Sequence, residues 1–310
     1  MIGTITLNPC VDKTLVIQGF TYGGMNRVSS QRTDVSGKGI NVSMVLTQLD
    51  VPVRTLGISF KKGARMMEES LNEAGIRYES VMVNGRLREN MKVMDEETAV
   101  TTELNQKGDF VSEEKLTEFE ELLEDCLKEL DILVITGSVP EGVDTDYYCR
   151  LVKKANEKGV KTVLDAEGEF LLKGLKAKPY LIKPNLFEFE TAFGLRTREV
   201  KDILVICRRI IAGGVNVVCL SMGDEGAMIV DKDEAYLCRP TPIDVKSTQG
   251  AGDSLVAGMC IALEKALPIS EMLRYGVAAA QGSLVREGTL LCTQEGFTEF
   301  EKIIKVEKIW

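Results

Sequence analysis

Residues 247–254 read Ser-Thr-Gln-Gly-Ala-Gly-Asp-Ser, and they lead into the run LVAGMCIALEKAL at 255–267. This run has the small and apolar composition of an amphipathic helix that is largely buried. Gly250 and Gly252 let the backbone fold tightly before it and leave several N–H groups unpaired at the helix N-terminus. Those groups and the helix dipole attract anions. The stretch therefore predicts an anion site at the start of a helix.

Asp253 is an unusual residue for the first turn of such a helix, because its carboxylate repels a static phosphate. It fits a phosphoryl transfer, in which Asp253 takes the proton of a substrate hydroxyl while the amides of 250–252 stabilise the moving phosphoryl group. A second interpretation needs no ligand, since aspartate is a favoured N-cap and Gly-Ala-Gly makes a turn. The segment alone leaves both interpretations open.

A second glycine loop, Ser36-Gly37-Lys38-Gly39, also precedes a helical stretch. Its apolar stripe consists of Val42, Val45, Leu46 and Leu49. Lys38 and Asn41 would lie near the mouth of a site, although a turn with a solvated lysine is the alternative. Neither loop is a standard nucleotide motif. Leu255 replaces the third glycine of the dinucleotide fingerprint, and Gly39 follows Lys38 where a Walker loop has Ser or Thr.

Short β-branched runs alternate with amphipathic stretches along most of the chain. We expect helices at 112–130, capped by Ser112, and near 144–158. We expect strands at 131–137, 161–166, 180–185, 215–221, 226–230 and 234–239. This order is typical of crossover units in a largely parallel sheet that is covered on both faces. Residues 10–36 and 86–107 alternate like strands and would form a small lid, so we expect one domain over 1–310 with that lid inserted.

The composition excludes several classes of protein. A net charge of −9 without a basic block argues against nucleic acid and against anionic membranes as partners. The first residues lack the features of a signal peptide, and no apolar run is long enough to span a membrane. The eight cysteines form no C-x-x-C pair, so we expect reduced thiols in a cytoplasmic protein. The absence of histidine excludes histidine-activated nucleophiles and histidine-ligated metals.

Six segments together resemble the ribokinase-like (PfkB) carbohydrate kinases. In that family's order they are TLNPCVD (6–12), SGKGINVS (36–43), TGSVPEG (136–142), KPNLFEFE (183–190), SMGDEGA (221–227) and TQGAGDSLVAG (248–258). The resemblance covers nearly the whole chain and implies a three-layer α/β/α sandwich, with a mostly parallel central sheet and a small β-sheet lid. The first segment, the third segment and LRENMKV (87–93) resemble the branch whose members phosphorylate sugar phosphates.

The resemblance implies roles for the residues that match the family's motifs. Asp253 would be the catalytic base, and the anion hole would consist of Gly250, Ala251 and Gly252. The substrate would contact Asp12, Gly37, Lys38, Asn41, Arg88, Ser138 and Arg27. ATP would contact Lys183, Asn185, Ser221, Gly223 and Gly226. Asn185 and Glu188 would act on Mg²⁺, largely through water, because this ion keeps several water ligands.

Each assignment has a purely structural alternative. Without the family, Asp12 reads as a turn carboxylate and Ser138 as a loop serine. Asn185 can cap a helix, and residues 221–226 can form a hairpin turn. Arginine's planar fork suits phosphate, which favours Arg88, although lone arginines on lid strands are usually solvated. Arg27 and Lys92 are weaker candidates, and solvation on the surface is the simpler interpretation of both.

The implied activity is ATP-dependent phosphorylation of a ketohexose monophosphate to a bisphosphate. Fructose 1-phosphate, giving fructose 1,6-bisphosphate, is the first expectation, and tagatose 6-phosphate and fructose 6-phosphate are alternatives. A kinase for an unphosphorylated sugar and a non-catalytic sugar-phosphate sensor compete with it. ATP and Mg²⁺ are the expected cofactors, and the lid implies a homodimer. The chain departs from the family pattern at Ser36, Thr136, Glu167, Gln249 and residues 59–62. The departure at 59–62 falls near the sugar side of the site, so it affects the identity of the sugar more than the chemistry of transfer.

Overall fold

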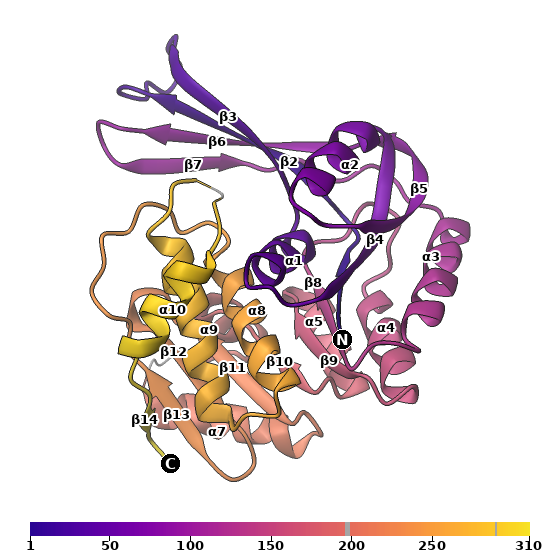
Figure 1. Cartoon of the computed structure of the whole chain (residues 1–310), viewed down its shortest axis with the longest axis vertical. Coiled ribbons are helices and arrows are strands. Elements are labelled where there is room, and N and C mark those ends of the chain that lie inside the picture. Colours follow the sequence, from indigo (N-terminus) through magenta and orange to yellow (C-terminus); the bar gives the residue numbers. More distant parts are fainter. Residues whose placement is uncertain (196–198, 289) are drawn as a thin grey trace.

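The computed structural model describes residues 1–195, 199–288 and 290–310, and the strands in these ranges form two sheets (Figure 1). The larger sheet contains, in spatial order, β14 (Glu307–Lys308), β13 (Ala235–Cys238), β12 (Ala227–Val230), β11 (Val217–Ser221), β10 (Leu181–Ile182), β9 (Lys161–Asp165), β8 (Ile132–Thr136), β1 (Ile2–Thr6), β4 (Val53–Lys62) and β5 (Tyr78–Arg86). The smaller sheet contains β3 (Val28–Ser36), β2 (Cys10–Ile17), β6 (Arg88–Asp95) and β7 (Val100–Leu104).

Helices cover both faces of the larger sheet (Figure 1). One face carries α2 (Ala64–Glu73), α3 (Glu113–Cys126), α4 (Tyr147–Glu157), α5 (Gly168–Gly174), α6 (Leu186–Phe193) and α7 (Val200–Ala212). The other face carries α1 (Lys38–Gln48), α8 (Ala251–Glu264), α9 (Ile269–Leu284) and α10 (Gln294–Ile303). The predicted three-layer sandwich is therefore confirmed. None of the described helices has the length and apolar character needed to cross a membrane.

The central strands are apolar on both sides because both faces of the sheet are covered. In β8, Ile132 and Val134 pack into one hydrophobic core, while Leu133 and Ile135 pack into the other. β1 runs parallel to β4 and β8, so the carboxyl ends of these strands lie at the same edge of the sheet. Residues that follow the strands converge there.

Most predicted elements are confirmed, with shorter bounds. Ser112 caps α3 by accepting a hydrogen bond from the N–H of Lys115, but the helix ends at Cys126 and not at 130. The strand predicted at 180–185 is reduced to Leu181–Ile182, since Pro184 has no N–H to offer to a ladder.

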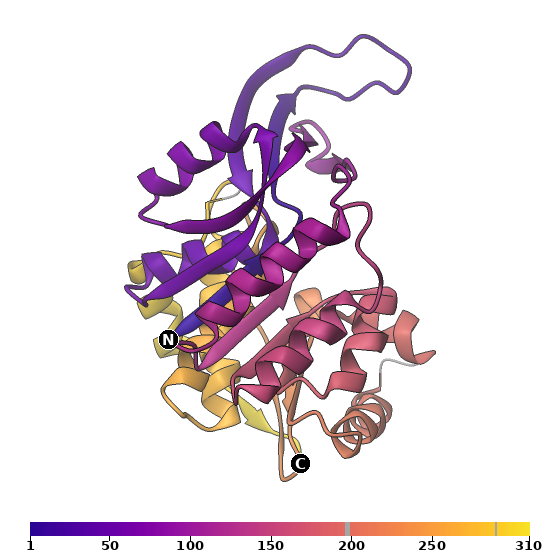
Figure 2. The same ribbon diagram turned by 90° about the vertical axis from the view of Figure 1, so that its right-hand side faces the viewer.

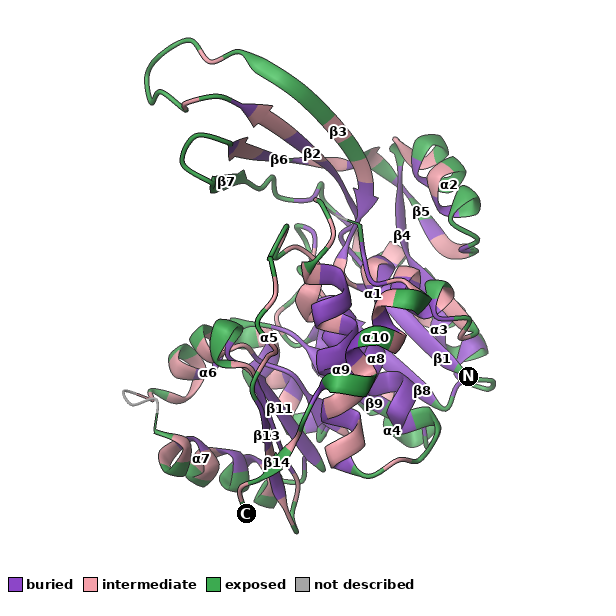
Figure 3. Ribbon diagram, turned by 60° about the vertical axis from the view of Figure 1, so that its left-hand side comes forward, coloured by how far each residue is buried: buried purple, intermediate pink, exposed green. Residues whose placement is uncertain are grey.

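The smaller sheet stands apart from the sandwich and is called the lid below (Figures 2 and 3). β2 pairs antiparallel with β3 and parallel with β6, and Asp12 lies opposite Asn90 in this register. Because side chains alternate between the faces of a strand, Asp12, Asn90 and Lys92 lie on one face. β3 is exposed along most of its length and β7 along all of it (Figure 3).

Candidate active site

A cavity of about 420 Å³ lies between the lid and the carboxyl ends of β1, β8 and β9. Its lining includes six of the predicted substrate residues and two of the catalytic ones, namely Asp12, Gly37, Lys38, Asn41, Arg88, Ser138, Gly250 and Asp253. The two glycine loops thus meet in one cavity, although 212 residues separate Asn41 from Asp253. The cavity has the size and the converging polar groups of a small-molecule site.

Asp253 is only 6% exposed and lies in the first turn of α8. The N-cap of this helix is Gly250, and its left-handed φ of 69° is one that glycine adopts without strain. The interpretation of Asp253 as an N-cap is therefore wrong. Its Oδ2 instead accepts a hydrogen bond of 2.7 Å from Nδ2 of Asn41 in α1. Burial raises the pKa of Asp253 to about 6, and the charge of Asp165 adds to the rise, so this carboxylate can accept a proton near neutral pH.

The N-terminus of α8 borders the same cavity. The N–H groups of residues 251–253 have no partner within the helix, and Ser254 N donates to Gly250 O at 2.8 Å. Ser254 Oγ also donates to this carbonyl at 2.8 Å and pairs with Ser283 Oγ of α9 at 2.7 Å. The turn is thus held by a contact with α9, and the N–H groups of Ala251 and Gly252, which were predicted as anion-hole donors, lie in the first turn of α8.

A buried carboxylate joins two lysines beside this turn. Lys183 Nζ lies 3.1 Å from Oδ1 of Asp165, and Lys38 Nζ lies 3.6 Å from Oδ2. Burial alone would raise the pKa of Asp165, but the charges of Lys183 and Lys38 outweigh it and hold the pKa below its ordinary value. Asp165 in turn raises the pKa of Lys38, which stays protonated. Lys183 Nζ also lies 3.8 Å from the point where a Cβ on Gly252 would stand.

Asp165 is a residue that the sequence analysis missed. The only signal in the sequence was its position at the end of a predicted strand. In the structure it lies beside Thr136 at the end of β8, and Thr136 Oγ1 donates to Asp165 Oδ2 at 2.9 Å. Strand ends at this edge of an open α/β sheet are where ligands bind.

The lid contributes a second buried carboxylate. Oδ2 of Asp12 accepts a hydrogen bond of 2.8 Å from Lys92 Nζ, and Oδ1 accepts one of 3.0 Å from Asn90 Nδ2. Burial acts to raise the pKa of Asp12, but the hydrogen bond and charge of Lys92 hold it below its ordinary value. Lys92 is 7% exposed, so its interpretation as a solvated surface lysine is wrong. Asn90 was not predicted, because its role depends on the register between β2 and β6.

Arg88 lies at the junction of the lid and the sandwich. Its guanidinium donates twice to Asn8 O, at 3.2 and 3.0 Å, and once to Gln106 O at 3.1 Å. Ser138 Oγ accepts a hydrogen bond of 3.1 Å from Asn8 Nδ2 across the cavity edge. Arg27 differs, because it is exposed in the turn between β2 and β3 and does not line the cavity.

The residues predicted for ATP follow β10 and β11, and Asn185 forms a β-bridge with Ser221. Asn185 Oδ1 accepts from Glu188 N, and Glu188 Oε2 accepts from Asn185 N, both at 2.8 Å, so the pair forms a capping box at the start of α6. Gly223 and Gly226, with φ of 62° and 100°, shape the hairpin between β11 and β12. The structural alternatives predicted for these segments are thus also present.

These oxygens suit a magnesium ion that is held through water. Within the described ranges, no group of three or more Asp, Glu, Cys or His side chains could hold a metal directly. Asn185 and Glu188 supply an amide and a carboxylate next to Lys183, and Mg²⁺ needs only one or two such oxygens because it keeps its water ligands.

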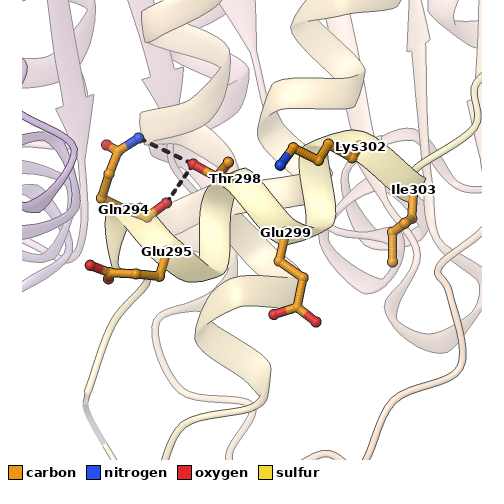
Figure 4. Close-up of a pocket in the computed structure, with 6 residues that line it drawn as sticks. All are labelled: Gln294, Glu295, Thr298, Glu299, Lys302 and Ile303. Atoms are coloured by element: carbon orange, nitrogen blue, oxygen red, sulfur yellow. Dashed lines mark hydrogen bonds between the residues drawn. The ribbon is translucent and has the colours of Figure 1, made fainter.

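A larger hollow of about 530 Å³ lies elsewhere, on the outer surface of α10 (Figure 4). Gln294, Thr298, Lys302 and the other lining residues all come from this one helix. Gln294 and Thr298 satisfy each other, since Gln294 Nε2 donates to Thr298 Oγ1 and this hydroxyl donates to Gln294 O. Without a second element to close it, the hollow has no converging groups that could hold a ligand.

Comparison with known proteins gives a consistent result. The pfkB family carbohydrate kinase profile matches residues 5–295. A 1-phosphofructokinase of Bacillus subtilis is 32% identical over 309 residues, and a tagatose-6-phosphate kinase of Staphylococcus epidermidis is 30% identical over 312, with 100% of each chain covered in both cases. The crystal structure of phosphofructokinase-2 from Escherichia coli in complex with potassium has a TM-score of 0.92 at 26% identity, covering 97% of this chain and 98% of that one.

Proposed function

The chain belongs to the pfkB family of carbohydrate kinases, and on that premise we propose that it transfers the γ-phosphoryl group of ATP to the free primary hydroxyl of fructose 1-phosphate. It is a phosphotransferase that acts on a sugar hydroxyl. The observation that carries the finer proposal is the position of Asp253, a buried carboxylate with a pKa of about 6 beside the free amides of α8. The full-length similarity to enzymes named 1-phosphofructokinase supports the choice of sugar.

In the proposed reaction, Asp253 takes the proton of the sugar hydroxyl as its oxygen attacks the γ-phosphorus. The bond from that phosphorus to the bridging oxygen breaks, and ADP leaves with the electron pair. The amides at the start of α8 and the charges of Lys38 and Lys183, both beside Asp165, would stabilise the negative charge that accumulates on the phosphoryl oxygens. Asn41 holds Asp253 in place through its hydrogen bond.

The lid would hold the sugar phosphate. Asp12 accepts hydrogen bonds from sugar hydroxyls, and Lys92 and Asn90 fix its orientation. Arginine has five N–H donors, so the three that Arg88 gives to backbone carbonyls leave others for phosphate oxygens. Gly37, Lys38 and Ser138 line the same cavity, and Arg27 remains a candidate only for a ligand that reaches the turn of the lid.

Asn185 and Glu188 would hold Mg²⁺ through water near the ATP phosphates. When bound, the ion neutralises charge on the phosphate oxygens. Lys183, Ser221, Gly223 and Gly226 would form the rest of the ATP site, and a Cβ added at Gly223 would meet no atom within 4 Å.

We further propose a single kinase domain over 1–310, a homodimer that forms through the lid, and a cytoplasmic location. The exposed strands of the lid support the dimer, and the eight unpaired cysteines are typical of a reducing compartment.

The test is a panel of ketohexose monophosphates with ATP and Mg²⁺, in which the formation of ADP is measured for each compound. Fructose 1-phosphate should give the highest kcat/KM, and fructose without phosphate should give little turnover. A higher value for tagatose 6-phosphate would move the assignment to that sugar, as the similarity to a tagatose-6-phosphate kinase permits. Binding of all these sugars without any ADP formation would indicate a sensor and overturn the proposal.

A further inference from the structure

Arg32 connects the lid to the sandwich. In the register of the lid it lies opposite Thr14, two residues from Asp34, and therefore shares the face of Asp12 and Lys92. Its Nε donates to Asp34 Oδ2 at 2.7 Å, and its Nη1 donates to the carbonyl of Glu287 at 3.3 Å. The guanidinium thus bridges a lid strand and the connection that follows α9.

Gly288 forms the seat of this guanidinium. Its φ is 58°, and a Cβ added at this position would stand 3.1 Å from both Cζ and Nη2 of Arg32. Such a distance is tighter than an ordinary van der Waals contact, so a side chain at 288 would require the guanidinium to shift by a few tenths of an ångström. The close fit of Arg32 to Gly288 brings the lid against the sandwich at this point.

The same connection reaches the turn that begins α8. The side chain of Leu291 is buried, and its Cδ2 lies 2.3 Å from the point where a Cβ on Gly250 would stand. At the other end of the connection, the N–H of Lys246 donates to Leu284 O at 2.8 Å and ties the segment before the turn to α9. Glu287 and Gly288 therefore contact the lid, and Leu291 contacts the anion-hole turn.

We propose that Arg32 is a positioning residue that couples closure of the lid over the phosphosugar to the anion-hole turn. It touches neither substrate and acts through Glu287 and Gly288. Each substrate then tightens the binding of the other, because a coupling between two sites is reciprocal. This inference rests on the proposed function, since it needs a phosphosugar under the lid and ATP at the turn.

The test compares the affinity for a non-hydrolysable ATP analogue with and without the ketohexose monophosphate that the unaltered protein turns over fastest. In the unaltered protein the phosphosugar should tighten the analogue roughly ten-fold, within the usual range of such couplings. In Arg32→Ala this ratio should fall to about one, while the affinity for the analogue alone stays the same. A ratio that survives in Arg32→Ala, or that is absent from the unaltered protein, overturns the proposal.

Matched control variants distinguish loss of the coupling from a general loss of stability. Arg65→Ala removes an arginine that is 90% exposed and donates to Glu69 in the same helix, and it should keep the full ratio. Gly288→Ala should lower the ratio, because the added Cβ shifts the guanidinium of Arg32 from its contact with this connection. Gly159→Ala imposes a similar strain, at φ 74° with no neighbour within 4 Å, and should keep it. An equal loss in Gly159→Ala and Gly288→Ala would contradict the role of the seat.

Failure of the proposed function and failure of the coupling give different experimental results. If no ketohexose monophosphate is turned over, the proposed function fails and the coupling falls with it. If one is turned over and Arg32→Ala still shows the full ratio, only the coupling fails.

Discussion

Asp253, Asp165 and Asp12 are three buried carboxylates in one site, and their partners give them different properties. Two lysines hold Asp165 ionised, and Lys92 does the same for Asp12. Burial raises the pKa of Asp253 to about 6, and the charge of Asp165 adds to the rise, because the hydrogen bond from the Asn41 amide and the charge of Lys38 offset burial only in part. Of the three, only Asp253 can exchange a proton near neutral pH, which separates the proposed base from the two positioning carboxylates.

This difference predicts the pH dependence of the reaction. The base must be ionised to accept a proton, so kcat/KM should be constant above pH 7 and fall roughly ten-fold per pH unit well below about 6. Asp253→Asn should lower kcat by about 10²–10⁴-fold and keep affinity for ATP. Steady-state rates from pH 5 to pH 8 check the first expectation. A flat profile over that range, or near-normal turnover in Asp253→Asn, would remove Asp253 as the base.

The pair formed by Asp12 and Lys92 predicts a stability effect. Lys92→Met leaves Asp12 buried without its counter-charge, which should lower the free energy of unfolding by about 3 kcal/mol. Lys13→Met is the matched control, because Lys13 pairs with Glu89 on the same strands but both side chains are over one third exposed. It should cost about 0–1 kcal/mol.

Denaturant titration of both variants and of Asp12→Asn/Lys92→Met measures this. The double variant should regain most of the lost stability without regaining activity, since no charge is left unpaired. Equal losses for Lys92→Met and Lys13→Met would show that burial of the first pair has no energetic consequence.

The sequence predicted the residues of the glycine loops, offered Lys92 only as a weaker candidate, and did not predict Asn90 or Asp165. Lys38, Asn41 and Asp253 stand in local patterns whose geometry follows from glycines and a helix start. The roles of Lys92 and Asn90 depend on which residue of β2 lies opposite them. Strand register is set by long-range pairing, and a single sequence does not specify it.

Among the elements, α1 and α8 matter most to the site, because the first turn of each reaches the cavity. Both helices lie on the same face of the sheet, and glycines let their ends approach it closely. Their existence was predictable from apolar periodicity. The length of β10 was harder to predict. Pro184 and the pairing with β9 and β11 limit this strand to two residues, and neither feature appears as a periodic pattern in the sequence.

Gly39 tests this close approach. A Cβ at this position would stand 2.2 Å from the carbonyl oxygen of Ile5 and 2.5 Å from Thr6 Oγ1 in β1. Gly39→Ala should therefore destabilise the protein by about 1–3 kcal/mol, although alanine is the better helix former. It should also reduce activity by moving Lys38 and Asn41.

Gly296→Ala in α10 is the control, since the nearest atom to an added Cβ there is 3.6 Å away. It should be neutral or stabilise the helix by up to about 1 kcal/mol. Urea titration of both variants gives the comparison. A Gly39→Ala protein as stable as the unaltered one would mean that α1 can move away from β1 without cost.

At the scale of the whole molecule, the lid is the part whose outer face is left most exposed. Its inner face meets the cavity, while its outer face carries apolar side chains in adjacent strands. Met91 lies opposite Leu104, and Asp95 lies opposite Val100, so Met91, Leu104 and Val100 share that face. All three are exposed, at 37%, 56% and 56%. The division into a large sheet and a small lid followed from the sequence, but what covers this face did not, because a cover that comes from outside the chain would leave no periodic signal.

A second copy of the chain is the proposed cover, and one substitution tests it. An exposed apolar face on a strand near a sheet edge favours association, because the apolar surface leaves water and the edge can pair. Leu104→Asp places a charge in that face and should convert a dimer into a monomer with an intact sandwich. Val205→Asp on α7, where the valine is 47% exposed, introduces the same charge elsewhere and should leave the dimer unchanged. Sedimentation velocity measures the mass of each form. An unaltered protein that sediments as a monomer at every concentration, or a Leu104→Asp variant that remains dimeric, would show that the outer face of the lid is not where copies of this chain meet.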